Sequence, residues 1–274
     1  MFENILGHSG PKKIIAQSLH TGAISHAYTF YGKEGIGKLK IALEFSKKLL
    51  NNENLNNCVD FKLITKLEDK QNILVEQIRD EIISDVYIAP ALGEYKVYII
   101  DDADKMNSAA QNTLLKTLEE PPQSVIIILI TSNIDALLPT ILSRTSNIFF
   151  ENLSMSEMKE YCKTNNIEID STMLEFADGS IKELLNMAGE DVLKKYTTIQ
   201  SVICGMNTKD KLKLIELFQE IDLKDRSTVE YLEFLLLKEG KYAKIQLIED
   251  AKKALLANAS EDMQKCKLVI ELMK

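Results

Sequence analysis

The residues from Gly32 to Leu39 have the types and spacing that bind a phosphate group. They read Gly-Lys-Glu-Gly-Ile-Gly-Lys-Leu, and the first seven satisfy the pattern G-x-x-x-x-G-K. Glycines let backbone N–H groups surround a phosphate, and the lysine neutralises its charge. The eighth position should carry a hydroxyl that binds Mg²⁺, and here it is Leu39. The pattern predicts phosphate binding through Gly32, Gly35, Gly37 and Lys38, with poor hydrolysis.

Two acidic residues follow the apolar stretch 97–100, namely Asp101 and Asp102. In phosphate-loop ATPases the first acid at this place holds Mg²⁺ and the second, usually Glu, polarises the attacking water. Asp102 is one methylene shorter than Glu, which reduces its reach by about 1.5 Å, and a misplacement near 1 Å can cost on the order of 10²-fold in rate. The alternative is a solvated acidic turn that caps the next helix. Leu39 and Asp102 both argue against hydrolysis while leaving phosphate binding intact.

The elements that must position these residues follow from hydrophobic patterning. Strands are predicted at 27–31, 61–65, 97–100, 125–131 and 147–150, and helices lie between them, including a long amphipathic one at 73–87. The candidate loop follows the first strand and precedes a helix at 40–50, which is the context that the motif requires. The alternation predicts an α/β parallel sheet with ligands at the carboxyl ends of its strands. Thr131-Ser132-Asn133 ends the fourth strand, where Asn133 could sense a terminal phosphate or serve as an ordinary turn residue.

Only helices are predicted after Glu151, so the fold class is α/β followed by all-α. The helices are expected at 154–164, 171–177, 181–188, 191–204, 209–220, 228–238, 241–258 and 261–273. A shift in composition at 150 and the start of a long helix near 191 are the predicted boundaries. They divide the chain into a P-loop domain (1–150), a small helical domain (151–190) and a C-terminal helical domain (191–274).

Composition restricts the class of protein. The net charge of −8 argues against nonspecific DNA binding by the whole chain, so any DNA contact needs a local basic face or a partner. The candidates for that face are Lys12, Lys13, Lys33, Lys40, Lys47, Lys48, Lys105 and Lys116, and the alternative is that they are solvated lysines. The four scattered cysteines (Cys58, Cys162, Cys204, Cys266) form no C-x-x-C pair, which indicates reduced thiols in a cytoplasmic protein and no zinc site. No apolar run approaches the roughly 18 residues of a membrane span.

The stretch 97–122 resembles the bacterial clamp-loader AAA+ subunits. Its part Leu-Leu-Lys-Thr-Leu-Glu-Glu-Pro-Pro (114–122) matches a specific signature of that group, and His8-Ser9-Gly10, Ser25-His26-Ala27-Tyr28 and Leu142-Ser143-Arg144 also fit it. The resemblance covers about residues 1–190 well and the remainder only in being helical. It implies an AAA+ domain with a five-stranded parallel sheet and a P-loop, a helical lid and a C-terminal helical collar domain that oligomerises.

The resemblance also implies roles for two basic residues. The family's Ser-Arg-Cys motif matches Ser143-Arg144-Thr145, and its arginine acts in trans on a neighbour's γ-phosphate. The alternative for Arg144 is a surface arginine in a salt bridge. The family's Gly-Ser-x-Arg motif matches residues 179–182 with Lys182 in place of arginine, which keeps the charge but not the planar fork. A plain helix cap at Gly179-Ser180 is the alternative there.

Within that family the chain resembles subunits that do not turn over ATP, because the gamma and tau type keeps an intact loop and a four-cysteine zinc module. The implied role is a non-hydrolysing stator in DNA replication. The implied partners are a gamma/tau-like ATPase subunit, delta-like subunits, a sliding clamp and primed DNA reached through the assembled complex, with no membrane. The cofactor question stays open for ATP or ADP, while Mg²⁺ and zinc are not expected. The alternatives are an active AAA+ ATPase of gamma/tau type and a small-molecule kinase, which the three unclustered arginines (Arg79, Arg144, Arg226) do not favour.

Overall fold

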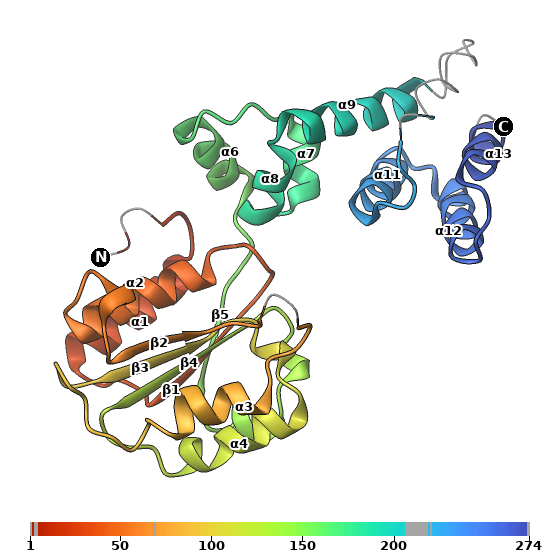
Figure 1. Cartoon of the computed structure of the whole chain (residues 1–274). Helices are drawn as coiled ribbons and strands as arrows, with labels where there is room; N and C mark the ends of the chain where they lie inside the picture. The colour runs from red at the N-terminus through yellow and green to blue at the C-terminus, as the bar shows by residue number, and fades with distance from the viewer. Residues whose placement is uncertain (1, 3–4, 68–69, 206–218, 220, 273–274) are drawn as a thin grey trace. The chain divides into compact units, whose positions relative to one another are not determined.

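The computed structural model describes residues 2, 5–67, 70–205, 219 and 221–272 (Figure 1). The chain forms two compact units, each considered by itself: unit 1 comprises Met1–Tyr161 and Asp178–Lys182, and unit 2 comprises Cys162–Ala177 and Glu183–Lys274. The division into domains 1–150, 151–190 and 191–274 stays a prediction. Among the described helices, none combines the length and apolar character that a membrane crossing requires.

Unit 1 contains a five-stranded parallel sheet, as predicted. The strands are β1 (Ala27–Tyr31), β2 (Phe61–Ile64), β3 (Lys96–Ile100), β4 (Val125–Thr131) and β5 (Ser146–Phe149), in the order β2-β3-β4-β1-β5. Its helices are α1 (Ser9–Thr21), α2 (Lys38–Leu50), α3 (Val75–Ile78), α4 (Ser108–Glu119) and α5 (Pro139–Leu142), and α6 (Met155–Thr164) starts in this unit. Short turns are η1 (Leu55–Asn57), η2 (Arg79–Ile83), η3 (Ala103–Lys105) and η4 (Ile134–Ala136).

Alternating residues of the central strand β4 face opposite sides of the sheet, and all seven are buried. Val125, Ile127 and Leu129 join the apolar cluster that includes α3 and α4. Ile126, Ile128 and Ile130 join the cluster that includes α1 and α2. Figure 1 shows these two helix pairs on opposite faces of the sheet. Burial on both faces explains the continuous apolar run in the sequence.

The predicted single helix at 73–87 is wrong. The structure has one α-helical turn at Val75–Ile78, followed by the π-helical turn η2, in which the N–H of Ser84 donates to the carbonyl oxygen of Arg79 at 2.9 Å. The buried residues of this stretch, Ile78, Ile82 and Val86, recur every four positions. A four-residue spacing stays on one face of an α-helix and also on one face of the wider i→i+5 turn, so the pattern does not distinguish the two.

Unit 2 is helical, as predicted for the chain after Glu151. It contains α7 (Ser171–Ala177), α8 (Ile181–Met187, whose first two residues belong to unit 1), α9 (Glu190–Gly205), α11 (Arg226–Lys238), α12 (Tyr242–Leu256) and α13 (Glu261–Leu272). Four aromatic side chains, Phe176, Tyr196, Tyr231 and Phe234, pack together, and the ring centroids of Tyr196 and Tyr231 are 4.4 Å apart. The helix predicted at 209–220 falls, apart from Gln219, outside the described residues.

Candidate functional site

Three segments that carry candidate residues meet at the carboxyl edge of the sheet because β4 lies between β1 and β3. Tyr31, the last residue of β1, pairs with Thr131, the last residue of β4. Ile100 at the end of β3 lies opposite Leu129. All three candidate segments therefore lie at the carboxyl edge, as expected for a parallel sheet. They are the phosphate loop (residues 32–38), the acidic pair at 101–102 and Asn133.

The phosphate loop needs glycine at two positions for steric reasons. Gly32 and Gly35 have φ angles of 145° and 77°, which disfavour side chains. A Cβ on Gly32 would lie 2.3 Å from the carbonyl oxygen of Phe150, and one on Gly35 would lie 2.4 Å from the Ser180 Oγ. These contacts explain why the loop carries glycine at both positions, and phosphate binding by the loop stays a prediction.

Lys38 is the first residue of α2 and only 6% exposed. Its ammonium donates to the carbonyl oxygens of Gly32 and Lys33, each at 2.6 Å. Burial lowers the pKa of Lys38, and the charges of Asp101 and Glu34 oppose that shift. Among the described residues, no side chain caps the N-terminus of α2, and its first turn has no acidic residue. A lysine and an uncapped helix N-terminus together favour the binding of an anion at this place.

Leu39 does not supply the metal-binding hydroxyl of the usual motif. Its side chain is half-buried and packs against the apolar cluster formed by α1, α2 and the sheet. The loop thus keeps the glycines and the lysine of the phosphate-binding pattern but lacks one Mg²⁺ ligand that phosphate loops ordinarily provide.

The acidic pair after β3 is partly buried. Burial raises the pKa of Asp101, the neighbouring charge of Asp102 raises it further, and Lys38 works in the opposite direction. The N–H of Asp102 donates to Asp101 Oδ1 at 3.1 Å. Asp102 itself has a φ of 51°, in the left-handed region, and stands at the start of η3. A carboxylate with a raised pKa beside a lysine is an arrangement found at functional sites.

A third carboxylate, Asp104, joins the ends of β3 and β4. Its side chain is 6% exposed and accepts hydrogen bonds from Thr131 Oγ1 at 2.9 Å and from the N–H of Ser132 at 3.2 Å. Asn133 is exposed, and its side-chain oxygen accepts from the N–H of Asp135 at 3.1 Å. Sequence reasoning missed Asp104, although it lies in the same acidic run. Asn133 acts as a local cap in this structure, which is what a turn residue does.

His8 connects the start of α1 to the loop. Its ring Nε2 lies 2.7 Å from the carbonyl oxygen of Ile36, and its ring centroid is 5.2 Å from that of Phe150. Burial lowers the pKa of His8, so the neutral ring donates this hydrogen bond at neutral pH. In the sequence, His8 stood out only through the family resemblance.

Residues 178–182, here called the clasp segment, hold the phosphate loop from one side within unit 1. Lys33 Nζ pairs with Asp178 Oδ2 at 3.0 Å. The carbonyl oxygen of Gly35 accepts from the N–H groups of Ile181 at 3.0 Å and Lys182 at 3.3 Å. Lys182 Nζ forms an ion pair with Glu34. The structure thus brings Lys182 to the loop, and its role in nucleotide binding stays a prediction.

Arg144 is not brought to the phosphate loop. It precedes the first residue of β5, whereas the loop follows the last residue of β1, and β1 and β5 are parallel neighbours. Arg144 therefore lies at the amino edge of the sheet. Its side chain is 34% exposed, and its guanidinium pairs with Glu119 Oε1 at 2.9 Å and donates to the carbonyl oxygen of Thr140 at 2.9 Å.

A buried glutamine supports the segment that leads to Arg144. The side-chain amide of Gln111 on α4 donates to the carbonyl oxygen of Ala136 at 2.9 Å, and its oxygen accepts from the N–H of Leu138 at 2.8 Å. Gln111 is 3% exposed. The signal in the sequence is its spacing, because Gln111 shares a helix face with Leu114 and Leu118.

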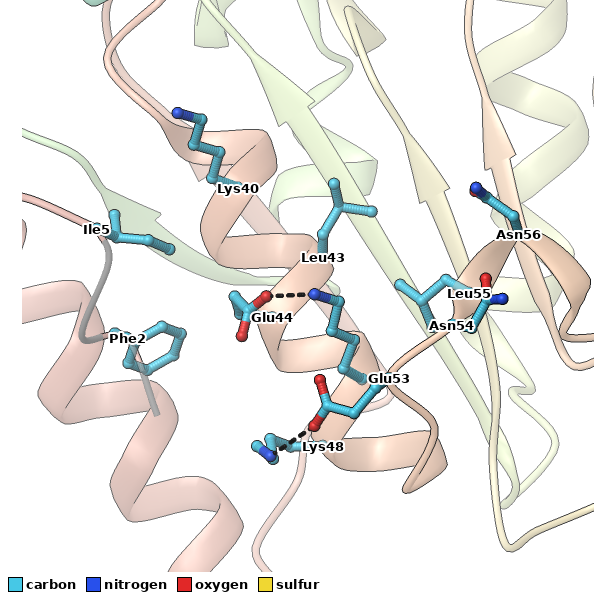
Figure 2. Close-up of a pocket in the computed structure, with 11 residues that line it drawn as sticks. Phe2, Ile5, Lys40, Leu43, Glu44, Lys48, Glu53, Asn54, Leu55 and Asn56 are labelled. Carbon is cyan, nitrogen blue, oxygen red and sulfur yellow. Dashed lines mark hydrogen bonds and ion pairs between the residues drawn. The ribbon is translucent and has the colours of Figure 1, made fainter. Parts of the chain in front are cut away.

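A cavity of ≈ 630 Å³ lies beside α2, with Phe2 and Leu55 among its lining residues (Figure 2). Two ion pairs lie in its wall: Lys47 with Glu44 at 2.6 Å, and Lys48 with Glu53 at 3.1 Å, the second of which is labelled in Figure 2. Lys33 and Lys105 also pair with carboxylates. Four of the eight lysines considered for a basic face are thus locally neutralised, and that face stays a prediction.

The sheet order, the glycine-rich loop after β1 and the acidic end of β3 define a P-loop protein of the AAA+ fold class. A solved structure from Thermotoga maritima, described as a DNA polymerase III gamma subunit-related protein, shares this fold with a TM-score of 0.56. The likeness covers 94% of this chain and 98% of that one at 18% identity. The family described as "DNA polymerase III, delta subunit" matches residues 7–154. This chain belongs to that family.

Two curated relatives extend the likeness beyond the matched region. The chain is 30% identical to DNA polymerase III subunit tau of Bacillus subtilis over 91% of its own length and 48% of the relative. It is 30% identical to DNA polymerase III subunit gamma of Buchnera aphidicola subsp. Acyrthosiphon pisum over 68% of its length and 57% of the relative. The chain thus spans about half the length of the curated relatives it matches.

Proposed function

We propose that this protein is a delta-prime-like subunit of a cytoplasmic clamp loader in DNA replication. In this role it is a stator that does not hydrolyse ATP. It supplies Arg144 to the active site of a neighbouring ATPase subunit and helps to load a sliding clamp on DNA. The observation that carries the proposal is the position of Arg144 at the amino edge of the sheet, remote from the chain's own phosphate loop. An arginine at that place can act only on a site outside its own loop.

The phosphate loop supports the non-hydrolysing part of the proposal. Leu39 packs into the apolar cluster instead of offering a hydroxyl, and Asp102 stands where a longer acid is usual. If a nucleotide binds, Gly32, Gly35 and Lys38 would hold its phosphates. The nucleotide would then serve as a structural ligand.

The partners proposed are those of a clamp loader: a gamma/tau-like ATPase subunit, delta-like subunits, the sliding clamp and primed DNA within the assembly. The helices of unit 2 and the predicted collar domain at 191–274 would contribute to oligomerisation. The predicted lid at 151–190 includes the clasp segment, which contacts the phosphate loop.

The second candidate is an active ATPase subunit of the gamma/tau type. The observation in its favour is that Lys38 and Asp101 are both present at the carboxyl edge, and the two curated relatives are tau and gamma subunits. A steady-state ATPase rate of the isolated chain that disappears in the Lys38→Ala variant would establish this alternative.

The test uses the complex reconstituted with an ATPase partner, a sliding clamp and primed DNA. Arg144→Ala should reduce DNA-stimulated hydrolysis at the adjacent site by about 10³-fold or more, because trans-acting arginines are worth roughly 10³–10⁵ in rate. The matched control is Glu119→Gln, which breaks the same 2.9 Å ion pair but keeps the guanidinium. It should leave the rate unchanged.

Measurements of unfolding free energy separate a trans-acting role of Arg144 from a role as a surface ion-pair partner. Both variants should lose no more than about 1 kcal/mol of unfolding free energy, because the ion pair is partly exposed. Equal hydrolysis rates for the wild type and Arg144→Ala, with the complex assembled, would show that Arg144 is only a surface ion-pair partner. In that case the proposed function would fail.

A further inference from the structure

The phosphate loop contains a carboxylate at its centre, Glu34, which pairs with Lys182 of the clasp segment. This pair joins residues 148 positions apart in the chain. The hydrogen bond from Lys182 holds the pKa of the Glu34 carboxyl group below its usual range. Glu34 is therefore ionised whenever the protein is near neutral pH.

The negative charge of Glu34 faces the same lysines that a phosphate would use. Glu34 interacts electrostatically with Lys38 as well as with Lys182. The backbone supports this arrangement, because the N–H groups of Ile181 and Lys182 donate to the carbonyl oxygen of Gly35, next to Glu34. The loop and the clasp segment thus hold each other through both charge and backbone hydrogen bonds.

We infer that Glu34 is an internal competitor of phosphate: a nucleotide binds when its phosphate takes Lys182 from the Glu34 carboxylate. This inference deepens the proposed function and rests on the part of it that assigns phosphate binding to residues 32–38. The ligand class is a nucleoside diphosphate or triphosphate. Glu34 then sets the affinity of the loop, and Lys182 changes partner from carboxylate to phosphate when the ligand binds.

The competition predicts a gain of affinity from a mutation inside the binding loop. Glu34→Gln removes the charge but keeps the size of the side chain. It should tighten ADP binding by roughly threefold to tenfold at low salt, the range expected for one unit charge at an exposed site. Glu53→Gln is the matched control, because it removes the same charge from the exposed pair with Lys48 near the far end of α2.

A double-mutant cycle distinguishes competition for Lys182 from simple repulsion. If Glu34 competes with phosphate for Lys182, the gain from Glu34→Gln should shrink to less than about twofold in the Lys182→Met background. If Glu34 only repels phosphate through space, the gain should be the same in both backgrounds.

The experiment is titration calorimetry of the full chain with ADP, repeated with inorganic pyrophosphate to separate a nucleotide from free phosphates. Tighter binding in Glu34→Gln, absent in Glu53→Gln and dependent on Lys182, supports the inference. Three results for ADP affinity overturn it: no change in Glu34→Gln, an equal gain in Glu53→Gln, or a gain in Glu34→Gln that does not depend on Lys182. It is also overturned if neither the wild type nor Glu34→Gln binds ADP. An effect on pyrophosphate without one on ADP overturns the assignment to nucleotides. The readout uses the isolated chain, so it does not depend on Arg144 or on trans hydrolysis in the assembled complex.

Discussion

Gly35→Ala tests whether the clasp segment is held against the phosphate loop. Gly35 has a φ of 77°, and a Cβ there would lie 2.4 Å from both the Ser180 Oγ and the Lys182 Cβ. The side chain therefore adds two costs, backbone strain and displacement of the clasp segment. The left-handed conformation costs about 1 kcal/mol for alanine. Displacement breaks two backbone hydrogen bonds to the Gly35 carbonyl oxygen, each worth about 1 kcal/mol net. The expected loss is the sum of these terms, about 3 kcal/mol.

Gly22→Ala is the matched control for strain. Gly22 has a φ of 70° at the end of α1, but a Cβ there would enter open space, with nothing from the described residues packed within 4 Å of it. Its replacement should cost only the strain, about 1 kcal/mol. The difference between the two variants, about 2 kcal/mol, then measures the packing of the clasp segment on the loop.

Two measurements check this difference. Urea unfolding of the full chain gives the change in free energy for each variant, provided that the slope with denaturant is unchanged. Amide hydrogen exchange at Ile181 and Lys182 gives the local effect, which should accelerate by about 30-fold in Gly35→Ala, the equivalent of about 2 kcal/mol. If Gly35→Ala costs no more than Gly22→Ala and these amides keep their protection, the contact between loop and clasp segment does not stabilise the protein.

Two carboxylates give pH-dependent predictions of opposite sign. Burial and the charge of Asp102 raise the pKa of Asp101, so its ionisation destabilises the fold as pH rises above about 4. Asp101→Asn should therefore melt a few degrees higher than wild type at pH 7 and equally at about pH 3, and a lower melting temperature at pH 7 would contradict this. Burial acts to raise the pKa of Asp225, but hydrogen bonds from Lys195 and Thr228 outweigh it and hold that pKa below its usual range. Asp225 caps α11, so Asp225→Ala should lose about 1–2 kcal/mol at pH 7, and the loss should fade as pH drops below about 4. A loss that is constant down to about pH 2 in urea titrations would show that the cap works without its charge.

The parts of the site predicted from the sequence depend on local chemistry. The loop needs glycines within a few residues of one another, and β4 needs an unbroken apolar run because both its faces are covered. Such signals are contained in neighbouring residues, so the strands, the loop and the acidic end of β3 were all placed correctly. The helix predicted at 73–87 was wrong because a four-residue spacing of buried side chains also fits a π-helical turn.

Local patterns were enough to predict an α/β sheet and a phosphate loop with Lys38 and without a metal-binding hydroxyl. The pairing of charged side chains, in contrast, depends on the folded chain. Glu34 pairs with Lys182, and Arg144 pairs with Glu119, across separations that no local pattern encodes. The position of Arg144 relative to the loop follows from the parallel direction of the strands. The phosphate loop follows the carboxyl end of β1 and Arg144 precedes the amino end of the parallel strand β5, so the two lie at opposite edges of the sheet. Charged residues look alike in a sequence, and their partners are set by this arrangement.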